Sequence, residues 1–267
     1  MTSAADAPTA EALLELARTV AREAAEHIQR LRAEGVDVAG TKSSEVDVVT
    51  LADQASEKLI REQILGARPD DGFVGEEGDD VTGSSGVRWV VDPIDGTVNY
   101  LYGVPAYAVS VAAQVSGEVV AGVVLNPAVG EEFAATRGGG ATRNGLPIGV
   151  RSFVSLEQSL FATGFSYEQA VRARQAGAIA RVLPRVRDIR RLGSCALDLC
   201  GVADGRFDAY AEEGVNLWDH AAGALVATEA GARVEVTTAP SGRAFILCAP
   251  RASFDSFHDL ARDAGML

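Results

Sequence analysis

The sequence has few cysteines and no long apolar run, and each scarcity excludes a class of protein. It has three cysteines in 267 residues, an odd number with no CxxC pair. That count excludes a disulfide scaffold and a CxxC-type zinc site, and we expect reduced, buried thiols. No run of about 18 apolar residues is present, and the N-terminus lacks the basic and apolar regions of a signal peptide. These absences predict a cytoplasmic protein with no membrane partner.

Positive charge is also scarce. Lysine and arginine together number 24 against 37 acidic residues, so the formal net charge is −13. Nucleic-acid binders depend on neutralising phosphates, so we expect no nucleic-acid partner. An anionic substrate would need a local cation, and carboxylates that hold a metal ion would supply one.

The composition is that of a soluble globular protein, with 47% hydrophobic and 23% charged residues. The length allows one large domain or two closely packed ones. The pattern changes near residue 150. We therefore expect an α+β half at 1–150 with an antiparallel sheet, and an α/β half at 151–267, without a linker.

In the first half, apolar residues at three- and four-residue spacing predict a helix over 10–33, which Gly35 ends. A second helix is expected over Leu51–Leu65. Ser116-Gly117 and Arg143-Asn144-Gly145 are hairpin-turn signals. The predicted strands are Gly72–Gly75, Val87–Val91, Ala106–Val115, Glu118–Leu125 and Glu132–Ala135.

In the second half, strands and helices alternate. The predicted strands are Leu160–Thr163, Asp188–Arg191, Phe207–Ala211, Val234–Thr237 and Ala244–Cys248. The predicted helices are Ala170–Val182, Ser194–Ala203, Asp219–Ala230 and Ser253–Ala264.

Two aspartates end an apolar strand in the segment VVDPIDGT. Asp92 and Asp95 follow Val91, and Asp, Pro and Gly are also common turn residues, so a surface turn is one interpretation. The other is a site for a hard cation such as Mg²⁺, which prefers oxygen ligands. Pro93 restricts the backbone between the carboxylates, and Gly96-Thr97 can offer N–H groups to a phosphate, especially if a helix begins there.

Further acidic residues follow apolar segments in the same way. Glu76 follows the strand at 72–75, and Asp219 follows Trp218 and opens a helix. Each has an ordinary alternative: Asp219 as a helix N-cap, Glu76 as part of a solvated loop, Asp95-Gly96 as a turn. Together they favour a metal site.

A covalent mechanism also fits part of the segment. Haloacid-dehalogenase-type phosphatases carry Asp-x-Asp-Gly-Thr, in which the first Asp is a nucleophile. Here Asp92 and Asp95 are one residue too far apart, and they lie far from the N-terminus. We therefore disfavour an aspartyl-phosphate intermediate.

GEE at 75–77, DPIDGTVN at 92–99 and LWDHAAG at 217–223 closely resemble the inositol monophosphatase family of Mg²⁺-dependent phosphatases. The resemblance extends to KSSEVDVVTLAD at 42–53 and RRLGSCALDLCGVADGRFDAY at 190–210, and so covers nearly the whole chain. It implies a layered αβαβα sandwich like that of fructose-1,6-bisphosphatase. It also implies a homodimer, lithium sensitivity and two to three Mg²⁺ ions in each active site.

By the resemblance, one metal is held by Glu76, Asp92 and the carbonyl of Ile94. A second is held by Asp92, Asp95 and Asp219, and a weaker third by Glu76 with waters. The implied catalytic residues are Asp53, Glu76 and Thr97, with Asp53 and Thr97 orienting the attacking water. Thr50 and Asp53 also read as a capping box, which is the ordinary alternative for Asp53.

The resemblance also implies a substrate site for a sugar or polyol phosphate. Cys195 stands where the family commonly has alanine, and Val98 and Tyr100 also depart from the family pattern. We expect Cys195 to be a packing residue rather than a nucleophile, and His220 to stay neutral and off the metal. The implied substrate contacts are Asp95, Gly96, Thr97, Gly193, Ser194, Cys195, Glu212 and Asp219.

The leading hypothesis is an enzyme that hydrolyses inositol 1-phosphate to myo-inositol and phosphate. Related substrates are histidinol phosphate, fructose 1,6-bisphosphate and 3′-phosphoadenosine 5′-phosphate, which the metal motifs do not distinguish because they bind the phosphate. The alternative from another class is a regulatory binding protein of the same family.

Overall fold

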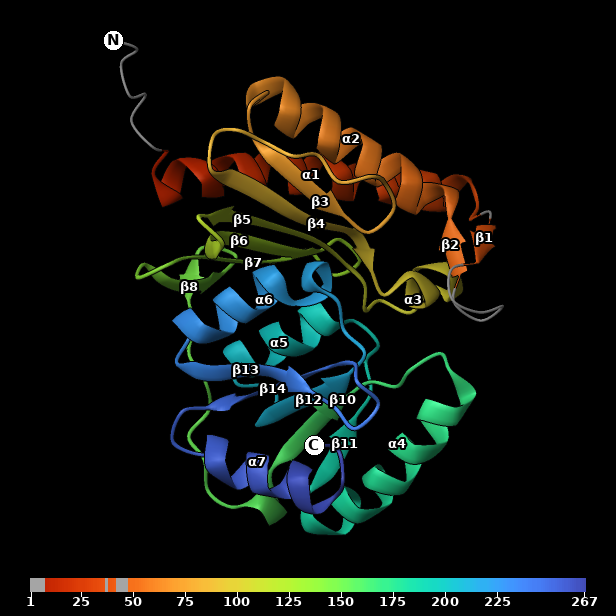
Figure 1. The fold of residues 1–267 in the computed structure, drawn as a ribbon, viewed down its shortest axis with the longest axis vertical. Helices are drawn as coiled ribbons and strands as arrows, with labels where there is room; N and C mark the ends of the chain where they lie inside the picture. The colour runs from red at the N-terminus through yellow and green to blue at the C-terminus, as the bar shows by residue number, and fades with distance from the viewer. Residues whose placement is uncertain (1–7, 37, 42–47) are drawn as a thin grey trace.

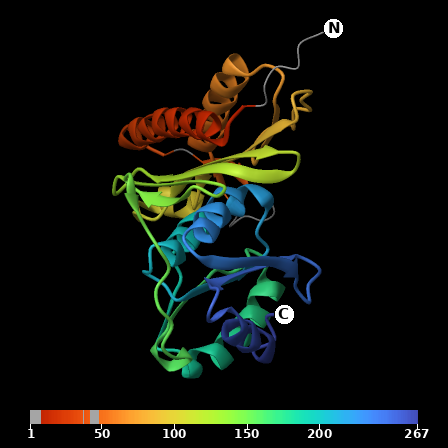
Figure 2. The same ribbon diagram turned by 90° about the vertical axis from the view of Figure 1, so that its left-hand side faces the viewer.

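Two β-sheets and three pairs of long helices stack as five alternating layers in the computed structural model, which describes residues 8–36, 38–41 and 48–267 (Figure 1). From the N-terminal end the layers are α1 with α2, a seven-stranded sheet, α5 with α6, a five-stranded sheet, and α4 with α7. The same order is seen from the side in Figure 2. The expected αβαβα sandwich is confirmed. Residues 42–47, the polar KSSEVD that begins the segment KSSEVDVVTLAD, lie outside the described residues.

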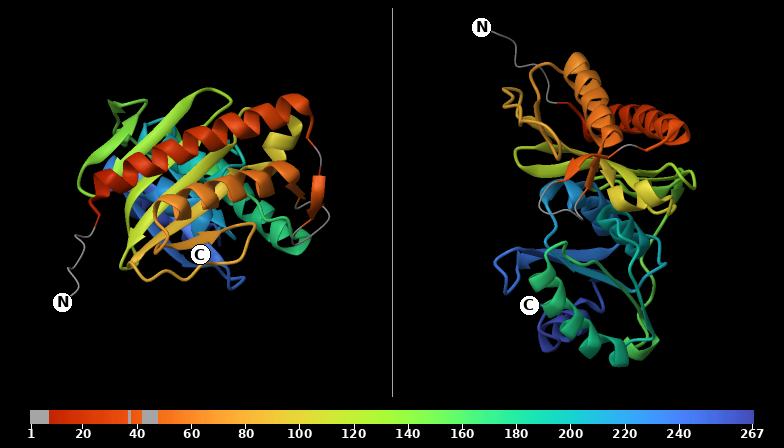
Figure 3. Two further views of the ribbon diagram at one scale, coloured as in Figure 1. Left: turned by 90° about the horizontal axis from the view of Figure 1, so that it is seen from above. Right: turned by 90° about the vertical axis from the view of Figure 1, so that its right-hand side faces the viewer.

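The first layer consists of α1 (Ala10–Glu34) and α2 (Leu51–Ala67), which run across one face of the larger sheet (Figure 3). The side chain of Thr9 caps α1 by accepting the Ala12 N–H, and the helix ends at Gly35 as predicted. A short antiparallel pair, β1 (Val38–Thr41) and β2 (Val48–Thr50), precedes α2.

The larger sheet follows the predicted strands closely. Only β3 and β4 pair in parallel, and the remaining neighbours are antiparallel. Both predicted turns form: Ser116 and Gly117 have φ values of 52° and 86°, and Asn144 and Gly145 have 50° and 77°, as type I′ hairpins require. In spatial order the strands are β3 (Gly72–Gly75), β4 (Val87–Asp95), β5 (Ala108–Val115), β6 (Glu118–Asn126), β7 (Glu131–Thr136), β8 (Gly140–Arg143) and β9 (Leu146–Pro147).

Strand β4 does not end at Val91, where we expected it to. It continues to Asp95, and its register against β5 shifts between Asp92 and Asp95. Pro93 has no N–H to donate to the ladder, so the strand bulges there. The bulge re-aims the two carboxylates, and α3 (Thr97–Tyr102) begins immediately after it.

The middle layer is α5 (Cys195–Ala203) and α6 (Leu217–Glu229), which lie between the sheets. They pack so closely that a Cβ on Gly223 of α6 would stand 3.0 Å from the Leu199 side chain. Every residue of α5 is buried. One apolar core joins the larger sheet, through Val124 and Phe133, to Leu225 of α6.

The smaller sheet has β10 parallel to both of its neighbours and antiparallel pairs elsewhere. Strand β12 starts two residues later than predicted, because Phe207 packs against Gly201 and its N–H bonds the Gly201 carbonyl at 3.0 Å. Short 3-10 helices span Leu156–Gln158 and Leu183–Arg185. The strands in spatial order are β11 (Asp188–Arg190), β10 (Leu160–Thr163), β12 (Ala209–Glu213), β14 (Ala244–Pro250) and β13 (Ala232–Thr238), with α4 (Gln169–Val182) and α7 (Phe254–Asp263) covering the outer face.

The cysteines are free and buried, as expected. In the described part of the chain, none of the helices combines the length and the apolar character that a bilayer crossing needs.

Candidate active site

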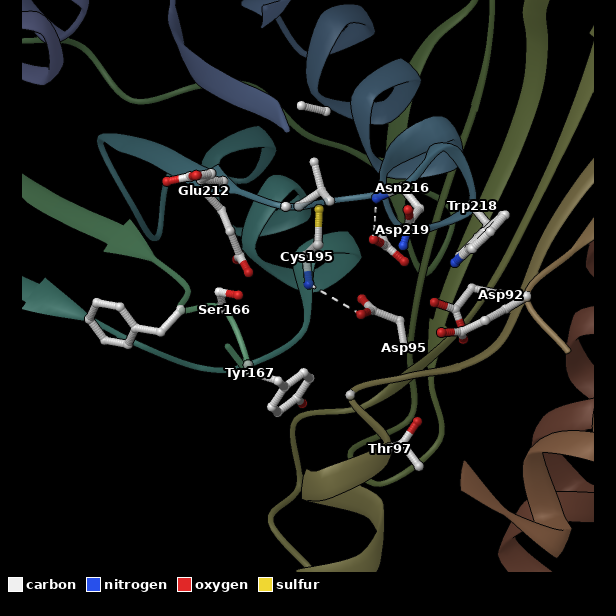
Figure 4. A pocket seen from close by; sticks show the side chains of 18 of the residues that line it. Asp92, Asp95, Thr97, Ser166, Tyr167, Cys195, Glu212, Asn216, Trp218 and Asp219 are labelled. Atoms are coloured by element: carbon white, nitrogen blue, oxygen red, sulfur yellow. Dashed lines mark hydrogen bonds between the residues drawn. The ribbon is translucent and has the colours of Figure 1, made fainter. Parts of the chain in front are cut away.

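A cavity of about 610 Å³ opens between the bulged end of β4, the N-terminal ends of α5 and α6, and the loop after β10 (Figure 4). Asp92, Asp95 and Asp219 gather on one side of it, and Ser166, Tyr167 and Glu212 lie across from them. Ten of the predicted site residues line the cavity: Glu76, Asp92, Ile94, Asp95, Gly96, Thr97, Gly193, Cys195, Glu212 and Asp219. Two do not, Asp53 and Ser194.

Asp95 is held by the N-terminus of α5. Its carboxylate accepts N–H bonds from Ala196 at 2.7 Å and Cys195 at 3.3 Å, and the Ser194 hydroxyl also donates to it. A helix N-terminus favours a negative charge. Burial outweighs these bonds and raises the pKa of Asp95 to about 7, with Glu212 and Glu76 adding repulsion. A bound cation would remove this penalty.

Asp219 lies in the first turn of α6, but it is not the N-cap that the sequence suggested. Asn216 is the cap, and its N–H donates to the Asp219 carboxylate at 2.6 Å. Burial, followed by repulsion from Asp95 and Glu76, raises the pKa of Asp219 well above its ordinary value. The capping bond therefore fixes a carboxylate that faces other carboxylates.

The bulge places Asp92 and the Ile94 carbonyl beside the cavity. Asp92 accepts the Ile94 N–H at 3.0 Å, and the Ile94 carbonyl accepts the Thr97 hydroxyl at 3.2 Å. Glu76 follows β3, where the buried Glu57 of α2 accepts the N–H of Glu77 at 2.7 Å. A buried side chain thus supports the loop that carries Glu76, which is not the solvated loop of the alternative interpretation.

Asp53 and Thr97 are brought together, although they are 44 positions apart. The Thr97 hydroxyl donates to Asp53 at 3.0 Å. Asp53 also forms the predicted capping box, since it accepts the Thr50 N–H at 2.8 Å. The capping box therefore forms, and the same side chain also reaches Thr97: one oxygen of Asp53 caps α2 and the other faces Thr97. A catalytic role for Asp53 stays a prediction. Asp53 lies behind Thr97 rather than on the cavity wall.

Gly96 and Thr97 form the expected turn into a helix. Gly96 is left-handed, with φ of 92°, and a Cβ there would stand 3.0 Å from the carbonyl oxygens of Ala106 and Gly193. Only glycine fits both the conformation and the space. Ser194 caps α5 and its hydroxyl donates to Asp95, and Ser194 does not line the cavity.

The donor set fits Mg²⁺. No group of three or more His, Cys, Asp or Glu side chains in ready chelating geometry occurs among the described residues. Mg²⁺ usually keeps several waters among its ligands, so the carboxylates need not stand in chelating geometry before it binds. Buried aspartates with raised pKa values, together with a carbonyl at the bulge, are hard oxygen donors that a cation would stabilise.

Cys195 and His220 behave as packing residues. Burial raises the pKa of the Cys195 thiol well above its ordinary value, and the negative charges of Asp95 and Asp219 add to this. A thiol so placed is a poor nucleophile. Burial lowers the pKa of His220, so the imidazole is neutral.

Several cavity residues escaped the sequence reasoning. Arg191 lies against the Cα of Gly193, and within the described chain no acid pairs with its guanidinium. Arg243 pairs with Glu168 across the rim. The indole N–H of Trp218 is buried with no partner in the described ranges. The double arginine before Gly193 was a usable signal for Arg191, whereas Ser166, Tyr167 and Arg243 come from loops with no motif.

Asp198 of α5 is a buried acid that the sequence reasoning also missed. Neither of its carboxyl oxygens has a hydrogen-bond partner among the residues described. Burial, then repulsion from Glu212 and Asp95, raises its pKa well above the ordinary 3.8. The group is therefore protonated in the folded protein at pH values where the unfolded chain has released its proton.

We therefore predict that Asp198→Asn raises the free energy of unfolding by an amount that depends on pH. Above pH 3.8 the folded protein keeps a proton that the unfolded chain has lost, so the wild-type unfolding free energy falls as pH rises, by up to about 1.4 kcal/mol per pH unit. The neutral variant lacks this loss, so its advantage over wild type should grow from pH 5 to pH 8. Urea unfolding at saturating Mg²⁺ measures the difference, with the exposed Asp255→Asn as control. A difference that does not change with pH would refute the neutral assignment.

Comparison with known proteins adds an independent finding. The model of the inositol monophosphatase family matches residues 9–256. The chain is 47% identical over 250 residues to inositol-1-monophosphatase SuhB of Mycobacterium tuberculosis, covering 87% of this chain and 86% of the relative. It is 40% identical over 228 residues to the Nus factor SuhB of Xylella fastidiosa, covering 85% and 81%. The solved structure of Mycobacterium tuberculosis SuhB superimposes with a TM-score of 0.84, at 41% identity over 97% of this chain and 99% of that one.

Proposed function

The chain belongs to the inositol monophosphatase family and is a phosphatase, and from this premise we propose that it hydrolyses inositol 1-phosphate with Mg²⁺. The observation that carries the proposal is the meeting of Asp92, Asp95 and Asp219 beside the Thr97–Asp53 pair in one cavity. Carboxylates from two elements, β4 and α6, would hold cations against a phosphate. The hydrogen-bonded pair would handle the proton of the attacking water.

The metal assignment follows from the donors. Glu76, Asp92 and the Ile94 carbonyl would hold one Mg²⁺, and Asp92 with Asp95 and Asp219 a second, with Glu76 and waters for a weaker third. Bound Mg²⁺ supplies charge neutralisation at the phosphate and a lower pKa for water. Two to three ions in each site is the stoichiometry that we propose.

The protein's own groups have separate tasks. The hydroxyl of Thr97 orients the attacking water, and Asp53 behind it accepts the proton that the hydroxyl relays. The N–H groups of Gly96 and Thr97 bind phosphate oxygens at the start of α3. Both tasks depend on the backbone of the bulge, which holds Thr97 beside the Ile94 carbonyl.

The far side of the cavity would bind the alcohol. Glu212 is an acceptor there, and the Arg191 guanidinium is a donor, so together they suit a ring that carries several hydroxyl groups. Gly193 and Cys195 also line the cavity. A polyol monophosphate therefore matches both ends of the cavity.

A panel of phosphates tests the substrate. We expect kcat/KM with Mg²⁺ to be about tenfold or more higher for inositol 1-phosphate than for histidinol phosphate, fructose 1,6-bisphosphate or 3′-phosphoadenosine 5′-phosphate. Release of inorganic phosphate gives the rates for all four. If inositol 1-phosphate is the poorest substrate, the proposal fails. A trapped aspartyl-phosphate would instead contradict direct attack by water.

We further propose a cytoplasmic, lithium-sensitive homodimer. The buried free cysteines support the reducing compartment. Tyr102, the last residue of α3, and Val104, just beyond it, are 79% and 44% exposed and offer apolar surface for a second copy. Sedimentation equilibrium gives the mass, and a monomer at micromolar concentration would exclude the dimer.

A regulatory role is the second candidate, because one relative carries the name Nus factor. An enzyme must keep its carboxylates, whereas a binding protein need not. In a cell that depends on this protein, a catalytically dead Asp95→Asn variant separates the two roles. Full rescue of growth by that variant would favour the regulatory role. If the variant does not rescue growth, the catalytic role is favoured.

A further inference from the structure

Tyr210 and Glu212 leave β12 on the same face because they are two positions apart. The alternate residues Ala209 and Ala211 belong to the core on the opposite face of the sheet. Tyr210 is fully buried in the core that contains α5 and α6, where its hydroxyl meets the Cys195 thiol. Glu212, one pleat further on, reaches the cavity.

The Tyr210 hydroxyl donates a hydrogen bond of 2.8 Å to Oε2 of Glu212. Within the described ranges this is the only hydrogen bond that the Glu212 carboxylate receives. Tyr210 does not line the cavity. It therefore touches a substrate-facing group without being able to touch the substrate.

Gly164 packs against the same carboxylate. It follows β10, whose Thr163 is aligned with Ala211 of β12, so Gly164 lies beside Glu212. A Cβ on Gly164 would overlap the Glu212 carboxylate. Because the φ of Gly164 is not left-handed, the backbone conformation does not require glycine there. The lack of space for a Cβ does. The Glu212 carboxylate is thus packed against the Cα of Gly164 and accepts one hydrogen bond, from the Tyr210 hydroxyl.

We propose that Tyr210 is a positioning residue that, with Gly164, locks Glu212 as the acceptor for a hydroxyl of the leaving alcohol. This lock selects polyhydroxylated alcohols over plain ones. The inference rests on the proposed function, because it takes the alcohol end of the substrate to face Glu212. A preformed acceptor loses no side-chain freedom on binding, and this improves affinity for the hydroxyl it receives.

The test is Tyr210→Phe, which removes one oxygen and keeps the ring. We expect the KM for inositol 1-phosphate to rise about five- to tenfold, the scale of one typical intramolecular hydrogen bond, with kcat within about twofold of wild type. With p-nitrophenyl phosphate, whose leaving group has no further hydroxyl, both constants should stay unchanged. Gly164→Ala should act in the same direction, and Asp255→Asn, at an exposed acid far from the cavity, should change nothing.

The outcomes separate the two proposals. Equal losses on both substrates, or a loss in kcat alone, would show a structural role and overturn the inference. If wild type cleaves p-nitrophenyl phosphate but not inositol 1-phosphate, the proposed substrate fails, and glycerol 2-phosphate then serves as the polyol ester for the same KM comparison. If Tyr210→Phe melts early, Gly164→Ala decides, and an unchanged KM for the polyol ester in that variant overturns the lock.

Discussion

Replacing Asp95 with asparagine is expected to lower kcat by on the order of 10³-fold, the upper scale for losing one charge-stabilising group from a preorganised site. Asp95 is the carboxylate that ties the bulge of β4 to the N-terminus of α5, through Ser194 and Ala196. An amide oxygen can keep one of these bonds, but it carries no charge for a cation. Activity against inositol 1-phosphate at saturating Mg²⁺ measures the loss.

The fold of Asp95→Asn should survive. Burial raises the pKa of Asp95 to about 7, so ionising the carboxyl is unfavourable when no cation is present. The metal-free variant should therefore melt at pH 8 no earlier than metal-free wild type, while Mg²⁺ should stabilise wild type more. Asp80→Asn, at an exposed acid, is the charge-matched control. A variant that keeps kcat within tenfold of wild type would remove Asp95 from the metal ligands.

The second large effect is a steep pH dependence of Mg²⁺ binding. In the metal-free protein, burial, with repulsion from neighbouring carboxylates, raises the pKa of Asp95 to about 7 and that of Asp219 well above its ordinary value. A cation needs both groups ionised, so binding must release their protons. Below pH 7 the Mg²⁺ affinity should rise about tenfold per pH unit for each proton released, and it should level off above the pKa values.

The metal-free stability should follow the opposite trend. From the ordinary pKa of 3.8 up to the raised pKa, the folded protein retains protons that the unfolded chain has lost, so its unfolding free energy falls as pH rises. Saturating Mg²⁺ should abolish this fall. Calorimetric titration at pH 6 and pH 8 in buffers of different ionisation enthalpy counts the protons. Equal affinities at both pH values, with no proton release at pH 6, would contradict the assignment of these carboxylates.

The sequence alone determined the periodic elements and the chemical type of the site. The spacing of apolar residues predicted α1 almost to its ends, because helix amphipathicity and the Gly35 stop are local properties. The two left-handed turns at Ser116-Gly117 and Asn144-Gly145 are local in the same sense. The carboxylates after apolar segments, together with the family resemblance, predicted oxygen ligands for a metal and a phosphate-binding turn at Gly96-Thr97.

Tertiary structure decided the position, the burial and the pKa values of those carboxylates. Whether β4 stops or bulges depends on its register with β5, a contact with a different strand. The raised pKa of Asp95 comes from burial against α5, which enters the chain about 100 residues later, and that of Asp219 from burial and from repulsion by Asp95, which lies on β4. The same holds for the opposite wall. Arg191 and the Tyr210–Glu212–Gly164 contact lie on elements that meet only when the smaller sheet forms.

The division has a physical reason. Propensity, capping and turn geometry act over a few residues, so short stretches of the sequence are enough to predict them. Electrostatic repulsion and packing act through space, so they depend on which strands become neighbours. For this protein the local code predicts a site for a phosphate and hard cations, and the packing of β10 beside β12 places Gly164 against Glu212 on the opposite wall of the cavity.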